Sequence, residues 1–327
     1  MSKPRPVLSQ MPWNVKQLIV DSGDTETKIA LRPVSKEFKG LVNRSKISYK
    51  QLSFELKADK RTAEITFVPY LGQTMQLEFI HNENGYKVKK LGIMGILVTE
   101  GNFIEAAVNQ FVKVVRNPKV LIESCEMHFY ENVYFEFSDY TKNEVLERLH
   151  PFLSSLPTPV CIERFWFKCL NQTDILKVLP YIKPRTLKRL HLVRPWTRED
   201  NEVDLSEVAE TDQWKLAEVL MLKGYSMTLP IEKWSHFKIV HVEIHKLTVI
   251  KLQVVYNSFL NSRQWHYCKL SSKRLNVQPF VEYFSQLGSH TTNGKVHSFS
   301  ITIPNSEKPL MVSIKNSCIY LYKDRGF

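Results

Sequence analysis

The spacing of hydrophobic residues changes twice along this 327-residue chain, and each change predicts a different kind of structure. Between residues 9 and 45, apolar side chains recur every three or four positions, which predicts three short helices. Pro33 disfavours a continuing helix, so it is expected to break the second run and to begin the third helix. That helix would carry Val34, Phe38 and Leu41 on a single face.

Residues 48–100 have a period of two, in which apolar and polar residues alternate. Asn84 and Gly85 stand between two such runs and are a strong hairpin signal. We therefore expect a small antiparallel meander in this part of the chain. Residues 102–116 then return to helical spacing.

Beyond residue 120, short strand patterns alternate with helical patterns. The predicted strands are 125–129, 161–169, 186–194, 218–224, 239–246 and 267–270, and the predicted helices are 141–154, 173–182, 205–217, 247–261 and 277–287. The apolar anchors Phe165, Leu190, Leu220 and Val242 are 25, 30 and 22 residues apart, close to the spacing of leucine-rich repeats. Each strand–helix pair leaves an apolar face open, so neighbouring pairs are expected to stack.

These patterns predict an α/β fold. Its parts would be three N-terminal helices, a small antiparallel meander and then an irregular, leucine-rich-repeat-like stack of strands and helices. Further strands are expected near the C-terminal end, and residues 289–295 (SHTTNGK) are expected to form an exposed loop.

Composition narrows the class of protein. The 43% hydrophobic content is enough for a sizeable core. No apolar run approaches the roughly 20 residues of a membrane span, and the first residues lack the apolar centre of a secretory leader, so neither a membrane nor export is expected. The five cysteines are scattered and form no C-x-x-C pair, which favours reduced thiols in the cytoplasm or nucleus.

A net charge of +12 permits binding to nucleic acid, acidic proteins or anionic lipid without requiring any of them. The charge is sharply divided in one place. Residues 177–198 carry seven Lys/Arg and no acid, and residues 199–212 carry seven Asp/Glu and no base. Either the two halves neutralise each other on a solvated surface, or the first half is a basic docking strip.

The sequence contains neither of the common phosphate-binding glycine motifs. The segment HVEIH (241–245) resembles a zinc-binding helix motif, but its Glu243 stands one place too late and the segment has strand character. In a strand, His241 and His245 would be roughly 13 Å apart, too far to share one zinc ion. We therefore expect no enzyme activity, no cofactor and no metal.

Two aromatic segments allow more than one interpretation. In RFWFKC (164–169), alternation puts Phe165 and Phe167 on one face and Trp166 on the other, where a helix could cover it or a partner could contact it. RQWHYC (263–268) mixes basic and aromatic residues, as proteins that bind single-stranded nucleic acid do, although structural packing of its rings is favoured.

The N-terminal helices raise a question of packing. Domains below about 40 residues usually need outside help to be stable, so three short helices bury too little surface on their own. Their apolar side chains must pack either on the rest of this chain or in a groove of another protein.

Residues 11–42 resemble an F-box. Met11 and Pro12 stand where that family has Leu-Pro, followed by Val15, Leu18 and Ile19 in the first helix, by Ile29, Ala30, Leu31 and Arg32 in the middle, and by Val34, Ser35, Lys36, Phe38, Leu41 and Val42 in the closing segment. The chain departs from the pattern in its inserted Pro33, its short middle helix and the Phe38 that replaces the commoner Trp.

The second half of the chain resembles the FTH domain, which follows F-boxes in a family expanded in nematodes. The matching segments, in order, are DILKVLPYIKPRTLKRLHL (174–192), QWKLAEVLMLKG (213–224), PIEKWSHF (230–237) and FLNSRQW (259–265). The resemblance implies an F-box in residues 1–46 and an FTH-type, leucine-rich-repeat-like domain in residues 118–327. Residues 47–117 would be a linker or the start of the stack.

The resemblance implies the target-recognition subunit of an SCF-type ubiquitin ligase, in which the F-box binds a Skp-type adaptor and through it a cullin scaffold. The C-terminal domain would bind a target protein that the sequence does not identify. By position, the adaptor-binding residues would be Met11, Pro12, Val15, Leu18, Ile19, Ile29, Leu31, Val34, Phe38 and Leu41. The alternatives are an interaction scaffold outside any ligase and, less favoured, a basic protein that binds nucleic acid.

Overall fold

The computed structural model describes most of the chain. The residues that it describes are 8–323 apart from 24, 32, 45–46, 58–60, 71–72, 93–95, 131–137, 169–170, 195–203, 225–228, 245–246, 263, 273–274 and 304–307. The chain divides into two compact units, Met1–Phe165 with Tyr181–Thr186, and Trp166–Pro180 with Leu187–Phe327. Both units combine helices with strands, which confirms the α/β class.

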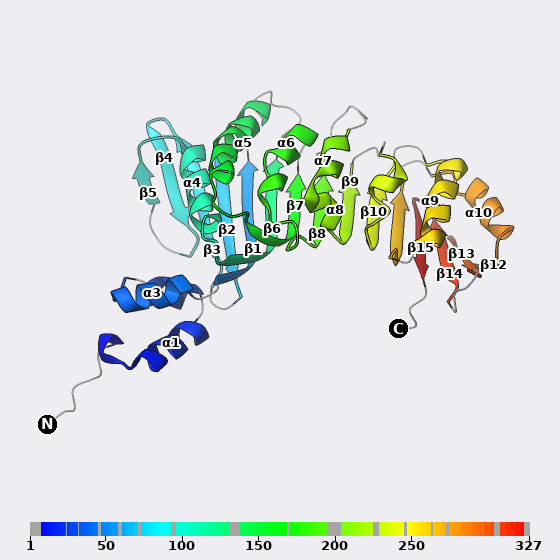
Figure 1. Cartoon of the computed structure of the whole chain (residues 1–327). Helices are drawn as coiled ribbons and strands as arrows, with labels where there is room; N and C mark the ends of the chain where they lie inside the picture. The colour runs from blue at the N-terminus through cyan, green and yellow to red at the C-terminus, as the bar shows by residue number, and fades with distance from the viewer. Residues whose placement is uncertain are drawn as a thin grey trace. The chain divides into compact units, whose positions relative to one another are not determined.

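The first unit begins with short helices (Figure 1). A 3-10 turn at Leu8–Gln10 precedes α1 (Trp13–Ser22), α2 (Thr25–Leu31) and α3 (Lys36–Arg44). The prediction that Pro33 begins the third helix is wrong, because the Ser35 hydroxyl accepts a hydrogen bond from the backbone N–H of Phe38 at 3.2 Å and the helix starts after it. Val34 therefore lies in the turn before α3.

Five antiparallel strands follow in chain order, as the period-two alternation predicted. They are β1 (Ile47–Lys57), β2 (Thr62–Pro69), β3 (Met75–Asn82), β4 (Gly85–Lys90) and β5 (Ile96–Thr99). The Asn84–Gly85 hairpin signal is confirmed, since Asn82 pairs with Gly85 across the β3–β4 turn.

One helix covers this meander. In α4 (Phe103–Val115), the ring of Phe111 meets the ring of Phe54 on β1 edge to face, with 5.9 Å between centroids. The side chain of Asn102 caps the helix by accepting hydrogen bonds from the backbone N–H groups of Ile104 and Glu105 at 2.7 and 3.2 Å. The predicted helix at 102–116 is confirmed.

After α4 the pairing changes from antiparallel to parallel. The strand β6 (Val120–Tyr130) runs parallel to β1, and α5 (Ser138–Ser154) leads to β7 (Cys161–Lys168), which lies beside β6. The strand order of this unit is β7, β6, β1, β2, β3, β4 and β5, with β7 belonging to it up to Phe165.

The second unit continues with parallel strands in chain order. These are β8 (Arg189–Val193), β9 (Val219–Lys223), β10 (Ile239–Glu243) and β11 (Tyr267–Ser271). An antiparallel group then follows beside β11, in the order β15 (Cys318–Lys323), β14 (Leu310–Lys315), β13 (Val296–Ile301) and β12 (Ser289–Asn293).

Two expectations for this unit are wrong. Residues 289–295 are not a loop, because 289–293 form β12, an edge strand whose side chains are all exposed and which therefore gave no apolar alternation. The helix expected at 205–217 is two helices, α7 (Ser206–Glu210) and α8 (Asp212–Leu216). Thr211 separates them because its backbone is extended and its hydroxyl accepts from the N–H of Trp214.

The remaining connections also contain short helical segments. They are α6 (Gln172–Leu176), the 3-10 turns Leu179–Tyr181 and Ile231–Lys233, α9 (Val249–Asn261) and α10 (Gln278–Ser285). The helix expected at 173–182 is thus reduced to α6 and a 3-10 turn. Phe284 on α10 packs against Phe299 on β13, with 5.7 Å between ring centroids, which shows the side of the strands that the helices cover.

The covered side of β8–β11 carries a ladder of buried side chains. Leu190 pairs with Leu220, Leu220 with Val240, and Val240 with Cys268, and none of the four is exposed to solvent. The predicted anchor Val242 is buried on the same side but pairs with Leu222, two residues further along the strand. Burial of this ladder is the main stabilisation of the parallel strands.

Candidate protein-binding surfaces

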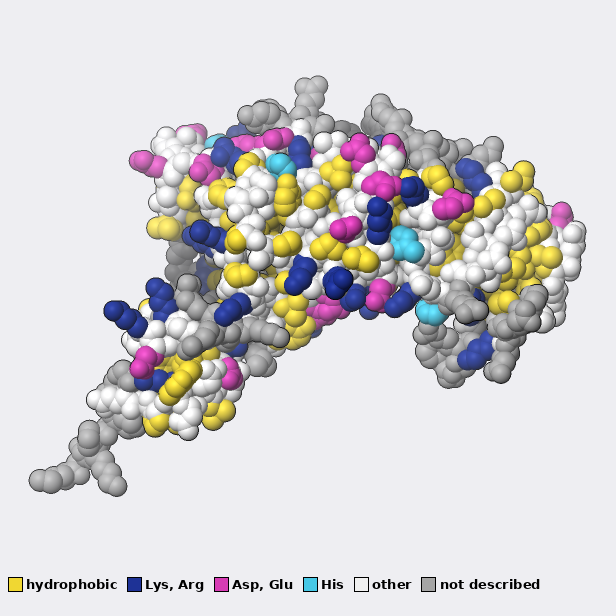
Figure 2. Space-filling view, viewed as in Figure 1, with side chains coloured by type: hydrophobic (Ala, Val, Ile, Leu, Met, Phe, Trp, Pro, Cys, Tyr) yellow, Lys and Arg dark blue, Asp and Glu magenta, His cyan; other side chains and the backbone are white. Residues whose placement is uncertain are grey.

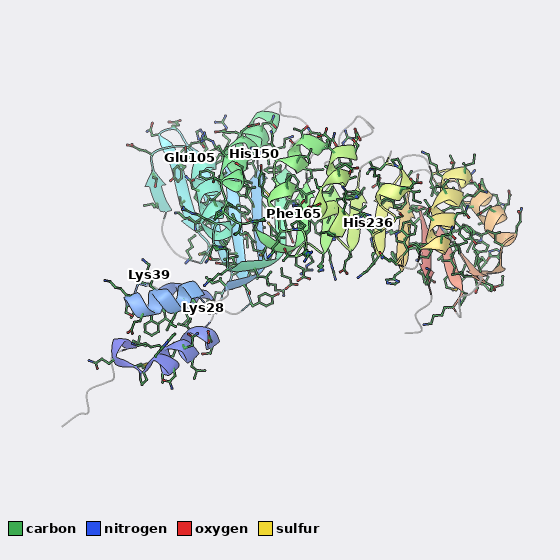
Figure 3. The ribbon with its side chains drawn as sticks, in the orientation of Figure 1. Lys28, Lys39, Glu105, His150, Phe165 and His236 are labelled. Carbon is green, nitrogen blue, oxygen red and sulfur yellow. The ribbon has the colours of Figure 1, made fainter. Side chains whose placement is uncertain are left out.

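The N-terminal helices enclose a small core of their own. Five side chains from α1, α2 and α3 form one buried cluster: Val20, Leu31, Phe38, Leu41 and Val42. Figure 3 shows side chains from α1 and α3 meeting between the two helices. An ion pair between Lys16 on α1 and Glu37 on α3 joins the same two helices at the edge of this cluster.

The structure divides the ten predicted adaptor-binding residues into groups. Leu31, Phe38 and Leu41 are buried in the three-helix core, at 7% exposure or less, and Ile19 packs against it. Pro12, Val15, Leu18 and Val34 are exposed, Met11 is half-buried, and the side chain of Ile29 lies outside the described residues. The expectation that Val34, Phe38 and Leu41 share one face of the third helix is wrong, because Val34 lies exposed in the turn before α3 whereas Phe38 and Leu41 are buried.

An apolar surface remains on the outside of these helices. Leu18 is 67% exposed and Val15 is 37% exposed on α1, and Val34 is 46% exposed in the turn before α3. Trp13, at the start of α1, is 52% exposed and was not among the predicted residues. Its signal was a large aromatic residue directly after Pro12. Figure 2 shows hydrophobic side chains on the surface of this part of the chain.

The second surface is the side of the strands that the helices of the second unit leave uncovered. We refer to this side of β8–β11, β14 and β15 as the open face. Its central row runs across the strands by direct pairing and consists of His191, Met221, His241, Lys269, Tyr320 and Ser313. The whole row is half-buried, in contrast to the ladder on the covered side.

Aromatic rings follow the open face from strand to strand. Trp166 of β7 meets the ring of His191 at 5.0 Å between centroids, and His241 meets Tyr267 at 5.1 Å. Tyr267 in turn meets Tyr320 edge to face at 6.3 Å. Trp166 is 39% exposed, so a helix does not cover it fully, and its contact with a partner stays a prediction.

Burial keeps two titrating side chains on the open face, Tyr267 and His241, uncharged at neutral pH. Burial raises the pKa of Tyr267 to about 12, so its hydroxyl stays protonated. Burial, followed by the nearby Lys269 ammonium, holds the pKa of His241 below its usual value, so its imidazole is neutral. The charge of this face therefore comes from its Lys, Arg and Glu side chains.

Charged side chains from the two halves of 177–212 form ion pairs with residues outside this segment. In the described part of the acidic half, Glu210 pairs with Lys215 and Lys233, and hydrogen bonds from Lys233 and then Lys215 lower its pKa to about 2. Lys188 of the basic half pairs with Glu218, outside the acidic half. Arg198 and residues 199–203 lie outside the described residues, so mutual neutralisation stays a prediction for them.

The segments that resemble the FTH signature are largely structural. Trp214 is buried, and its indole N–H donates to the carbonyl of Lys233 at 2.6 Å. The His236 ring N–H donates to the carbonyl of Trp214 at 2.9 Å, and burial holds the pKa of His236 (labelled in Figure 3) below its usual value. Trp234 stacks on Trp265 at 5.4 Å. These residues link successive connections between strands.

The zinc-like segment is a strand at its described positions. His241, Val242 and Glu243 belong to β10, with Val242 buried, and His245 lies outside the described residues. In the described part of the chain, no group of three or more His, Cys, Asp or Glu side chains could hold a metal ion. No helix among the described residues is long and apolar enough to cross a membrane.

Comparisons with known proteins agree with the sequence motifs. The family model described as FTH domain matches residues 143–287, within the predicted 118–327. The chain is 21% identical over 315 residues to F-box A protein 224 of Caenorhabditis elegans, across 94% of this chain and 77% of that protein. No solved structure matches the chain at a significant level.

The match over 143–287 indicates an FTH domain in this part of the chain. Together with the similarity to an F-box protein over almost the whole chain, this match supports the resemblance to F-box/FTH proteins.

Proposed function

We propose that this chain is the target-recognition subunit of an SCF-type ubiquitin ligase. Helices α1–α3 would bind a Skp-type adaptor, the adaptor would join a cullin scaffold, and the strand–helix domain would bind the protein to be ubiquitinated. The single observation that carries this proposal is the set of exposed apolar side chains on helices whose own core is already closed. The F-box name of the similar C. elegans protein supports it.

In this proposal the chain performs no bond chemistry. It would hold a target beside the ubiquitin-carrying component of the ligase and so raise the effective concentration of the reacting groups. The proposed place of action is the cytoplasm or the nucleus, where its scattered cysteines would stay reduced.

The structure sharpens the residues that we propose to contact the adaptor. Pro12, Val15, Leu18 and Val34 are kept from the predicted set because they are exposed, and Trp13 is added for the same reason. The buried Leu31, Phe38 and Leu41 would support the surface from inside instead of contacting the adaptor.

A binding assay with a purified Skp-type adaptor tests the proposal. Leu18→Asp combined with Val34→Asp should weaken binding at least tenfold, because each carboxylate would be desolvated in an apolar interface. Ile250→Asp on α9 is the matched control, since Ile250 is 74% exposed outside the proposed surface and its replacement should leave binding unchanged. Circular dichroism would verify that all variants keep their helices.

The other candidate functions predict different results in the same experiments. A scaffold outside any ligase predicts that the wild-type chain does not bind the adaptor, and that result would contradict our proposal. A nucleic-acid-binding protein predicts binding to mixed DNA or RNA that falls by powers of ten between 50 and 200 mM salt, because each neutralised phosphate releases counterions.

A further inference from the structure

The charge of the open face is strongly unbalanced. The central row of the open face is flanked by one row of side chains on each side. The three rows together include one acid, Glu243, and four basic residues: Arg189, Lys223, Lys269 and Lys315. The Glu243 carboxylate accepts a hydrogen bond from the backbone N–H of Gly224, just after β9, at 3.2 Å. The face therefore carries a net positive charge.

These four basic side chains form no ion pair in the described part of the chain. The uncovered side of the first unit is different. There Lys57 pairs with Glu64 at 2.7 Å, and Arg164 pairs with Glu123. The positive charge of the open face is thus not balanced by ion pairs of its four basic side chains, and it attracts anions from solution.

Two of the lysines flank a single aromatic ring. The Lys269 ammonium lies 5.6 Å from the centroid of the Tyr320 ring, and the Lys315 ammonium lies 5.2 Å from it. Two like charges near one ring repel each other. Carboxylates that bind beside Tyr320 would relieve this repulsion by pairing with the two ammonium groups.

We propose that the open face binds an acidic segment of a partner protein, with its carboxylates at Lys269 and Lys315 and its apolar parts on the neighbouring rings. This proposal deepens the proposed function. It rests on that function only where it names the partner as the target for ubiquitination. β15 lies between β11 and β14, and neighbouring strands are about 4.8 Å apart, so the backbones at Lys269 and Lys315 stand roughly 10 Å apart and each lysine can meet a different carboxylate of an extended segment.

The ring geometry favours a peptide over a nucleic acid. Binding of single-stranded nucleic acid uses open ring faces on which bases stack. On this face Tyr267 and Tyr320 meet edge to face, and both lysines lie at the Tyr320 ring. The rings offer edges and partly covered faces, which suit the side chains and backbone of a peptide.

Fluorescence anisotropy on the full chain tests this proposal with a labelled peptide of alternating glutamate and tyrosine. We expect binding that weakens as salt rises, and at least tenfold weaker binding by Lys269→Gln with Lys315→Gln. A control peptide in which glutamine replaces every glutamate should bind the wild-type chain at least tenfold more weakly than the acidic peptide does. The matched control is Lys251→Gln with Lys295→Gln, which removes two exposed charges elsewhere and should bind the acidic peptide within twofold of wild type.

Equal binding of the acidic peptide by the Lys269/Lys315 variant and the wild type, or no binding at all, would overturn the proposal. So would tighter binding of mixed single-stranded DNA that depends on the same two lysines, because the partner would then be a nucleic acid. Loss of adaptor binding through Leu18 and Val34 leaves this assay unaffected, so failure of the proposed function and failure of this inference are distinguishable.

Discussion

Residues of one type have opposite environments in this chain, and their environment decides their chemistry. Leu41 is 1% exposed in the core of the N-terminal helices, whereas Leu18 is 67% exposed on the outside of the same helices. The cysteines differ in the same way. Cys125 on β6 and Cys268 on β11 are buried, and Cys161 and Cys318 are half-buried at the starts of β7 and β15.

Thiol reactivity should follow this division. Burial raises the pKa of the Cys125 and Cys268 thiols above their usual value, and only the thiolate form attacks an alkylating reagent. We expect iodoacetamide at neutral pH to modify Cys161 and Cys318 in the native chain well before Cys125 and Cys268, as measured by peptide mass spectrometry. All four should react equally in urea. Early modification of Cys125 or Cys268 in the native chain would show that their strands open in solution.

At the scale of elements, tight turns fix the pairing of the antiparallel strands, and two glycines in them differ in their surroundings. Gly85 begins β4 with φ of 145°, a conformation that side chains rarely adopt, and a Cβ there would lie 2.2 Å from the carbonyl oxygen of Thr99 on β5. Gly294, between β12 and β13, has φ of 60°, and a Cβ there would meet nothing within 4 Å. Of these two glycines, Gly85 alone combines backbone strain with a close approach.

Replacing each glycine by alanine should separate these two effects. Gly294→Ala should lower the free energy of unfolding by about 1 kcal/mol, from backbone strain alone. Gly85→Ala should lower it by about 2–4 kcal/mol, since overpacking against β5 adds to the strain. Urea unfolding followed by circular dichroism would measure both, and equal effects would mean that β5 moves away from β4 at little cost.

At the scale of the whole molecule, the parts differ greatly in how much apolar surface they bury. The N-terminal helices have a core of five buried side chains, whereas the strands and the helices that cover them bury many more apolar side chains. A core this small gives little stability on its own. The helices at 13–44 should therefore be the part of the chain whose backbone hydrogen bonds open most readily.

Hydrogen exchange measures this difference directly. We expect amides in α1 and α3 to exchange at least tenfold faster than those in β6 and in β8–β11. Under the proposed function, saturating Skp-type adaptor should slow exchange in α1 and α3, because a ligand that binds only the folded form stabilises it. Exchange in β8–β11 should not change. Slow exchange in the free chain would mean that these helices are stable without a partner.

Much of the fold could be predicted from periodicity. The alternation of apolar residues located β1–β5, and the buried side of β8–β11 followed from Leu190, Leu220 and their neighbours. The alternation was absent in β12, whose residues are all exposed, and the helical pattern hid the break at Thr211 between α7 and α8. Both errors arose where hydrogen bonding, and not burial of an apolar side, determines the local structure.

The candidate surfaces were less predictable than the elements that carry them. Periodicity places Val15 and Leu18 on a helix, but it does not say which side of that helix its neighbours cover. The row from His191 to Tyr320 comes from strands far apart in the sequence, and the pairing register decides which of its side chains are adjacent.

The sequence by itself determined most of the order of helices and strands, the α/β class and the resemblance to F-box and FTH proteins, because short-range spacing and motif order are properties of the chain alone. Only the tertiary structure decided that Phe38 and Leu41 are enclosed while Leu18 and Val34 are exposed, and that Lys269 and Lys315 lie at one ring. The physical reason is that burial and pairing depend on which segments meet in space. The same spacing of apolar residues along the chain is compatible with several such arrangements.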